Sequence, residues 1–254
     1  MTAPFTGVAV ALVTLFDDGL AVDLEATGAL AAGLVEAGVR AIVTAGTTGE
    51  AASLDRDERV ALIRAVRHAV PDDVPVIAGT GAPSARQAIA FTRDAAAAGA
   101  AAALALSPPS TGDPRPYYEA IAFAVPDIPL LAYHYPAVSS PGISLEHLTD
   151  LPVAGCKDST GDVDRLLAEV TTWDRPVYPG SAAIAYTAGQ LGCPGAILAL
   201  ANAEPELCVA AFAGDVEAQK ALYPAHAAQR GKFPHGIKAL TAKRFGTSTV
   251  ARMG

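Results

Sequence analysis

The stretch LPVAGCKDSTGD, residues 151–162, has the pattern of a strand that ends in polar residues and runs into a helix. Its apolar part is short, as in a strand that is buried on both faces. Asp158 and Asp162 follow at positions where a carboxylate can cap the next helix. The stretch therefore predicts one β-strand, a polar loop and one α-helix.

The same unit recurs along the chain. Apolar runs of strand length begin at eight positions: Gly7, Val39, Val74, Ala101, Ile128, Val153, Arg175 and Gly195. Segments with helical spacing lie between them, such as residues 53–70, where Ser53 is the expected N-cap. Strands that are apolar on both faces and alternate with helices predict a parallel sheet covered by helices. Eight units in about 250 residues predict an α/β fold of the (β/α)8 or TIM-barrel type.

We expect one catalytic barrel domain, residues 1–214, and a short C-terminal helical extension, residues 215–254. The alternative is an open doubly wound sheet, which needs a glycine-rich turn after an early strand. GTGAPS, residues 79–84, supplies only half of that turn, because it lacks the third glycine and has Pro83 where the helix should begin. The barrel is therefore the favoured architecture.

Composition excludes several kinds of partner. The net charge of −8 argues against nucleic acid and anionic membrane surfaces, which attract clustered lysine and arginine. Cys156, Cys193 and Cys208 are widely spaced, so neither a disulfide framework nor a zinc site is indicated, and we expect a reducing cytoplasm. The chain starts without a basic signal region, and the apolar run at residues 95–106 is too short to span a membrane.

Polar residues that close the strands of such a barrel are the candidates for its active site. TAGTTGE, residues 44–50, closes the second strand with Thr47 and Thr48, Tyr133 closes the fifth, and Lys157 closes the sixth. Burial disfavours the ammonium form, so a lysine at the barrel mouth becomes a nucleophile that can form a Schiff base. A hydroxyl-rich turn can hold the carboxylate of a keto acid beside it, and a tyrosine can relay protons.

Each of these residues also has an ordinary explanation. A strand-end lysine commonly extends its amine to solvent or forms a salt bridge, and a GTTG sequence is commonly a plain turn. Lys157 stands out because it is set in a buried strand. The other four lysines fall in the polar C-terminal stretch, where solvated side chains are expected: Lys220, Lys232, Lys238 and Lys243. By strand alternation His134 should point away from Tyr133 and pack under a helix.

Five motifs in chain order resemble the dihydrodipicolinate synthase and N-acetylneuraminate lyase family: GTTGE, GTG, PP, YxxP and KDSTGD. The resemblance runs from about Thr6 to Asp215. It implies a (β/α)8 barrel that joins or releases pyruvate and an aldehyde through a lysine imine, without metal or cofactor. It also implies assembly into a homo-oligomer, a tetramer or a dimer.

The resemblance assigns a role to each candidate residue. Lys157 matches the imine lysine, and Tyr133 and Thr47 match the proton relay. Thr48 matches the threonine that holds the pyruvate carboxylate. Gly180 and Ile197 match positions that line the substrate site.

The chain departs from the family at two places. Ser110 and Thr111 stand where a relay tyrosine is common, and Tyr117 and Tyr118 fall inside the next expected helix. Val138 stands where dihydrodipicolinate synthases carry an arginine for the second substrate carboxylate. The second departure favours an aldolase for 2-keto-3-deoxy sugar acids, with dihydrodipicolinate synthase as the alternative, whereas the first is what a barrel without turnover would show. A barrel that binds a keto acid without turnover, and a sugar-phosphate aldolase, are weaker hypotheses, the last because no basic phosphate site follows strands seven and eight.

Overall fold

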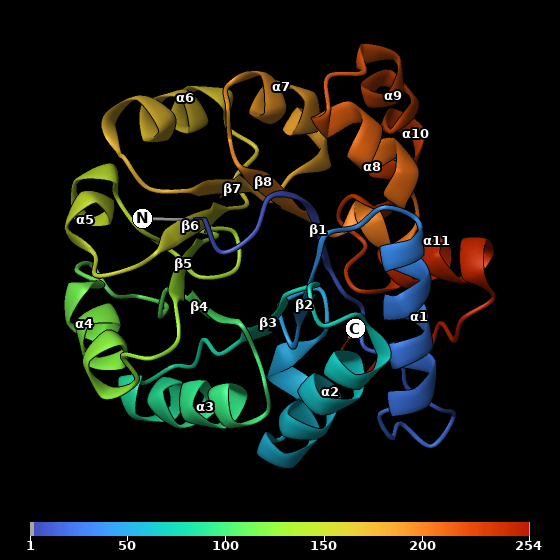
Figure 1. The fold of residues 1–254 in the computed structure, drawn as a ribbon, viewed down its shortest axis with the longest axis horizontal. Coiled ribbons are helices and arrows are strands. Elements are labelled where there is room, and N and C mark those ends of the chain that lie inside the picture. The colour runs from blue at the N-terminus through green and yellow to red at the C-terminus, as the bar shows by residue number, and fades with distance from the viewer. Residues whose placement is uncertain (1–2, 254) are drawn as a thin grey trace.

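The computed structural model describes residues 3–253, and within them eight parallel strands form a barrel (Figure 1). The strands are β1 (Gly7–Ala11), β2 (Ala41–Thr44), β3 (Val76–Gly79), β4 (Ala102–Leu106), β5 (Leu130–His134), β6 (Gly155–Asp158), β7 (Val177–Pro179) and β8 (Gly195–Leu198). From β1 to β7 each strand pairs with its neighbours in chain order, β1 also pairs with β8, and β7 lies against β8, so that the barrel is nearly closed. The prediction of a (β/α)8 barrel is confirmed, and the doubly wound alternative is wrong.

Helices surround the barrel on its outside, as Figure 1 shows. They are α1 (Leu24–Glu36), α2 (Arg56–Ala69), α3 (Ala85–Ala97), α4 (Arg115–Ala124), α5 (Leu145–Asp150), α6 (Val163–Thr172), α7 (Ala185–Gln190) and α8 (Pro205–Phe212). Three further helices follow: α9 (Val216–Ala221), α10 (Tyr223–Gln229) and α11 (His235–Phe245). None of the helices between residues 3 and 253 has the length and apolar character needed to cross a membrane.

Alternation along the strands separates two kinds of core. One set of side chains fills the barrel interior and includes Val43, Leu104, Tyr133, Tyr178 and Ile197. The intervening residues point outward and pack beneath the surrounding helices. This alternation decides which strand-end residues face the barrel mouth.

The glycines of the GTG motif serve strand packing. A Cβ on Gly79 would lie 2.1 Å from the carbonyl oxygen of Ala45, and a Cβ on Gly81 would lie 2.6 Å from the amide nitrogen of Leu106. No side chain fits at either position, because the neighbouring backbones approach too closely. The motif that half resembled a dinucleotide-binding turn is therefore explained by barrel geometry.

Two of the predicted helix caps are wrong. Asp55, not Ser53, caps α2, and it forms a capping box with Glu58. The Ser53 hydroxyl instead donates to the carbonyl of Glu50 at 2.9 Å. Asp162 caps α6 as predicted, whereas Asp158 belongs to β6 and has other partners.

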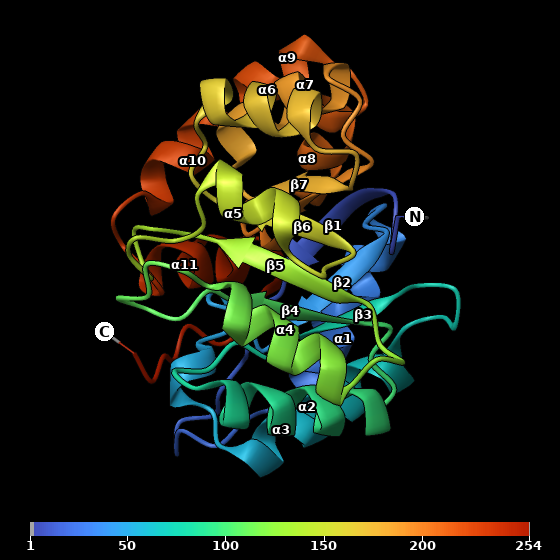
Figure 2. The same cartoon turned by 90° about the vertical axis from the view of Figure 1, so that its left-hand side faces the viewer.

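One of the four C-terminal lysines departs from the expectation, while Lys220, Lys232 and Lys243 are exposed as predicted. Lys238 on α11 is fully buried, and its Nζ lies 2.5 Å from Oε1 of Glu50, which is also fully buried. After α11 the chain returns to the barrel. Figure 2 shows the C-terminus on the side to which the arrowhead of β5 points. The boundary at residue 214 remains a prediction.

Candidate active site

Lys157 and Tyr133 lie side by side at the carboxyl ends of β6 and β5. The strand register pairs these two residues directly. Nζ of Lys157 is 4.3 Å from the centre of the Tyr133 ring. The lysine side chain is buried, and burial lowers its pKa from 10.5 to about 7. A large fraction of the amine is therefore neutral and nucleophilic near neutral pH.

The ordinary explanations for Lys157 do not apply. The residue is 4% exposed, so its amine does not extend into solvent. Among residues 3–253 no carboxylate forms an ion pair with it, and burial is the cause of its lowered pKa. A lysine that is both buried and unpaired is costly for the fold, which is typical of a functional group.

Tyr133 carries a hydroxyl in reach of other hydroxyls. Ser159 Oγ donates to the Tyr133 hydroxyl at 3.4 Å. Burial raises the pKa of Tyr133, and hydrogen bonding from Ser159 and Thr47 opposes the rise. The structure thus brings Thr47 and Tyr133 together. It also adds Ser159, which sequence reasoning missed although alternation from Lys157 places it on the same face.

The TAGTTGE segment forms a tight turn after β2. Ala45 and Glu50 at its two ends have φ angles of 50° and 56°, in the left-handed region that residues with a side chain rarely adopt. The Glu50 amide donates to the Thr47 carbonyl at 3.0 Å, and the Thr14 hydroxyl donates to the Gly49 carbonyl at 2.8 Å. Strained backbone of this kind persists only where surrounding contacts hold it, and it concentrates at functional sites.

Gly180 directly follows β7, and Ile197 lies in β8. The Gly180 amide donates to the Asp158 carbonyl at 2.6 Å. A Cβ on Gly180 would lie 2.0 Å from Ser159 Oγ, so glycine is what lets Ser159 occupy its position. Ile197 is fully buried in the same interior cluster as Tyr133.

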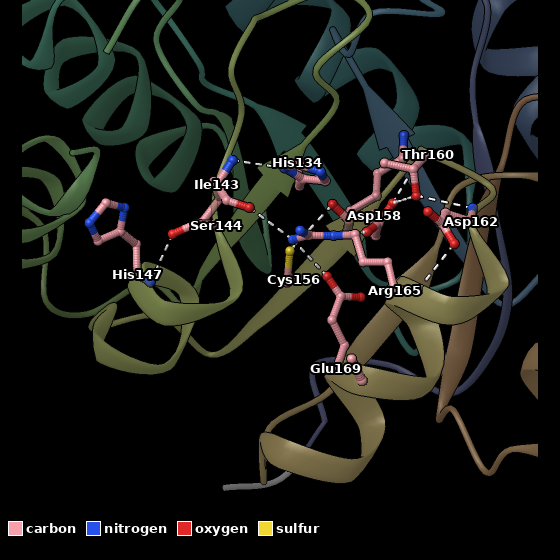
Figure 3. A network of polar contacts seen from close by, with 12 residues as sticks. His134, Ile143, Ser144, His147, Cys156, Asp158, Thr160, Asp162, Arg165 and Glu169 are labelled. Carbon is pink, nitrogen blue, oxygen red and sulfur yellow. Dashed lines mark hydrogen bonds and ion pairs between the residues drawn. The ribbon is translucent and has the colours of Figure 1, made fainter. Parts of the chain in front are cut away.

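A polar network stands behind Lys157, on the outer face of β6 (Figure 3). Arg165 Nε lies 2.6 Å from Asp158 Oδ2, and Arg165 Nη2 lies 2.9 Å from Glu169 Oε1. Glu169 is fully buried, and burial raises its pKa to about 8. His134 also faces this side, as predicted. Its Nδ1 accepts from the amide of Ile143 at 2.8 Å, and burial lowers its pKa to about 4.

The two departures from the family pattern are visible in the loops after β4 and β5. Ser110 is exposed and left-handed, with φ 60°, and its amide donates to the Ser140 carbonyl at 2.7 Å. Tyr117 and Tyr118 lie in α4, as predicted, and their hydroxyls donate to backbone carbonyls. Val138 is 52% exposed. Among residues 3–253 no cluster of three histidine, cysteine or acidic side chains is arranged to hold a metal.

A buried, unpaired lysine at the mouth of a (β/α)8 barrel is the arrangement of a lyase that works through a lysine imine. The comparisons with known proteins agree with that class. The model of the dihydrodipicolinate synthetase family matches residues 4–235. The chain belongs to this family and is therefore a pyruvate-dependent carbon–carbon lyase that uses a lysine imine.

Individual relatives are similar over most of their length. The 4-hydroxy-tetrahydrodipicolinate synthase of Pseudomonas aeruginosa is 38% identical over 85% of this chain and 78% of its own. The dihydrodipicolinate synthase structure from Bacillus anthracis has a TM-score of 0.88 at 27% identity, covering 99% of this chain and 92% of that one. YagE, an Escherichia coli K12 prophage protein of the same family solved with pyruvate, has a TM-score of 0.89 at 26% identity, covering 97% and 91%.

Proposed function

We propose that the protein is a 4-hydroxy-tetrahydrodipicolinate synthase that condenses pyruvate with aspartate semialdehyde. The observation that carries the proposal is the Lys157 amine, buried beside Tyr133 with its pKa lowered to about 7. Curated relatives with this name support the choice of reaction over the sugar-acid aldolase that the sequence favoured. The residue roles below are part of the same proposal.

The neutral Lys157 amine attacks C2 of pyruvate, and the former keto oxygen leaves as water, which gives the imine. Loss of a proton from C3 then produces an enamine, whose carbon attacks the aldehyde carbon of aspartate semialdehyde. The amino group of that substrate next adds to C2 and displaces the Lys157 amine, so that ring closure releases the product and frees the lysine. Tyr133 and Thr47 carry protons between the amine, the departing oxygen and the new alkoxide. Tyr133 is suited to this because burial keeps it protonated while two hydroxyls lie in reach.

Thr48 and the amides of residues 46–49 hold the pyruvate carboxylate. The turn is half-buried and is made of small or hydroxyl-bearing residues, which leave its N–H groups accessible to an anion. Gly180 and Ile197 line the opposite side of the site, where Gly180 leaves room for the Ser159 hydroxyl.

A second candidate function is the cleavage of 2-keto-3-deoxy sugar acids, and one observation favours it. Val138 offers no charge to the second carboxylate of aspartate semialdehyde. Arg115, the first residue of α4, is engaged with Asp113 at 2.8 Å. A neutral hydroxylated aldehyde needs no such cation. A barrel that binds the keto acid without turnover is the remaining alternative.

Two measurements test the proposal. Borohydride reduction in the presence of pyruvate should leave a stable mass increment on Lys157, and a Lys157→Ala variant should remain unlabelled. An increment on another lysine would remove the assignment. The ratio of kcat/KM for aspartate semialdehyde and for glyceraldehyde, each with pyruvate, then separates the two functions. A preference for glyceraldehyde of ~10-fold or more would establish the aldolase instead. An imine without product from either aldehyde would indicate a binding protein.

Assembly and location belong to the proposal as well. We expect a homotetramer or homodimer in the cytoplasm, where the three free, buried cysteines stay reduced. Light scattering on the purified protein measures the oligomeric state.

A further inference from the structure

Glu50 closes the turn that carries Thr47 and Thr48, and its conformation is unfavourable by itself. It has a side chain and yet adopts φ 56°, and it is fully buried. Its amide donates to the Thr47 carbonyl at 3.0 Å, and the following amide, of Ala51, donates to Gly46 at 3.2 Å. The backbone geometry of the turn therefore depends on what holds Glu50 in place.

The C-terminal part of the chain supplies the partners of the Glu50 carboxylate. Oε1 lies 2.5 Å from Nζ of Lys238, and Oε2 accepts from the amides of Arg252 and Met253, each at 2.8 Å. Lys238 in turn donates to the carbonyl of Val250 at 2.5 Å. Residues 250–253, which we call the C-terminal strap, are thus tied to the turn through one buried carboxylate.

The Arg252 side chain adds a second set of contacts between the strap and the rest of the barrel. Its guanidinium makes a two-point contact with Glu58, at 2.6 and 2.7 Å, and this contact lowers the pKa of Glu58. It also donates to the carbonyls of Leu20 and Ser53, at 2.7 and 3.1 Å, and lies 4.5 Å from the centre of the Phe16 ring. Paired planar contacts of this kind fix geometry as well as charge.

We propose that the C-terminal strap positions the GTTG turn for pyruvate binding, with Arg252, Lys238 and Glu50 as positioning residues. None of the three is assigned contact with substrate. Lys238 and the strap hold the left-handed Glu50, and Glu50 in turn holds the Thr47 carbonyl and the turn amides that face the pyruvate carboxylate. The proposal rests on the proposed function for the role of the turn, and it concerns residues that motif comparison left without a role.

The test compares three variants of the full chain. Arg252→Ala removes the two-point contact, and Arg252→Lys keeps the charge without the planar fork. Arg244→Ala is the control, because Arg244 lies on α11 and its ion pair with Glu206 is about half exposed on both sides. We expect Arg252→Ala to raise the pyruvate concentration for half-maximal borohydride trapping by about 10-fold with kcat within about 3-fold of the wild type. Arg252→Lys should fall between, and Arg244→Ala should match the wild type.

Hydrogen exchange supplies a readout that does not depend on the reaction. Amides of residues 45–53 should exchange about 10-fold faster in Arg252→Lys than in the wild type, while those of β3 stay unchanged. Faster exchange with unaltered pyruvate saturation would overturn the link to substrate binding. Unchanged exchange in the turn would overturn the proposal that the strap positions it. This outcome is independent of the proposed function, which fails separately if borohydride traps no pyruvate on the wild type.

Discussion

Replacing Lys157 by methionine should stabilise the protein, and more strongly at low pH. Methionine keeps most of the side-chain volume but carries no amine, so the variant loses the cost of burying an ammonium. In the wild type, burial lowers the Lys157 pKa from 10.5 to about 7. The folded state therefore binds fewer protons than the unfolded state between pH 7 and 10.5, and wild-type stability rises with pH over that window.

The magnitude follows from the size of the shift. At about 1.4 kcal/mol per pKa unit, the full cost of burying the charged amine is about 5 kcal/mol below pH 7. The cost falls to about 2 kcal/mol at pH 9, because above that pH only the remaining stretch of about 1.5 pH units up to the unfolded-state pKa of 10.5 still favours protonation in the unfolded state. The difference in unfolding free energy between Lys157→Met and the wild type should therefore shrink by about 3 kcal/mol from pH 6 to pH 9.

Urea unfolding at pH 6, 7.5 and 9 measures this difference, because groups other than Lys157 titrate alike in both proteins. The single tryptophan, Trp173, is buried and reports unfolding by fluorescence. A difference that is independent of pH would refute the claim that the Lys157 amine titrates near pH 7 in the folded protein. A variant less stable than the wild type at pH 6 would show that the lysine has a favourable partner.

The remaining predictions concern the groups around the amine. Tyr133→Phe should lower kcat by roughly 10² to 10⁴ with little change in stability, since only the hydroxyl is lost; an unchanged kcat would return Tyr133 to a packing role. Ser159→Ala should slow turnover more than Ser110→Ala, because Ser159 lies 3.4 Å from the Tyr133 hydroxyl whereas Ser110 is exposed; steady-state rates of both variants decide this, and the reverse order would place Ser110 in the relay. Gly180→Ala should lower the free energy of unfolding in urea by about 1 to 3 kcal/mol, because the added Cβ would lie 2.0 Å from Ser159 Oγ. A variant as stable as the wild type would mean that the ends of β6 and β7 shift apart at little cost.

Regular patterns made the barrel and its mouth predictable. Eight apolar runs with helical segments between them left few architectures, and alternation along a strand set Lys157 toward the interior and Asp158 away from it. The pairing of Tyr133 with Lys157 follows once adjacent strands are known to be parallel and in register. These features depend on local sequence and on one repeated packing rule.

Features that depend on distant partners were not predictable in the same way. Glu169 lies on the buried face of α6, three residues after Leu166, and its charge is met there by Arg165, which also contacts Asp158 on β6. Lys238 lies in a polar stretch, and its partner Glu50 is far away in the sequence, in the turn that follows β2. Charge patterns along a helix indicate solvent exposure only when no oppositely charged group from another element covers them.

The two buried lysines show which property separates a nucleophile from a structural cation. Both have Nζ 4.3 Å from the centre of an aromatic ring, Tyr133 for Lys157 and Phe16 for Lys238. Burial lowers the pKa of both, but at Lys238 the Glu50 carboxylate opposes that shift, while at Lys157 no carboxylate does. An ion-paired amine stays protonated and has no lone pair to offer a carbonyl. Burial without an acidic partner is therefore the property that makes Lys157, and not Lys238, the amine expected to carry pyruvate.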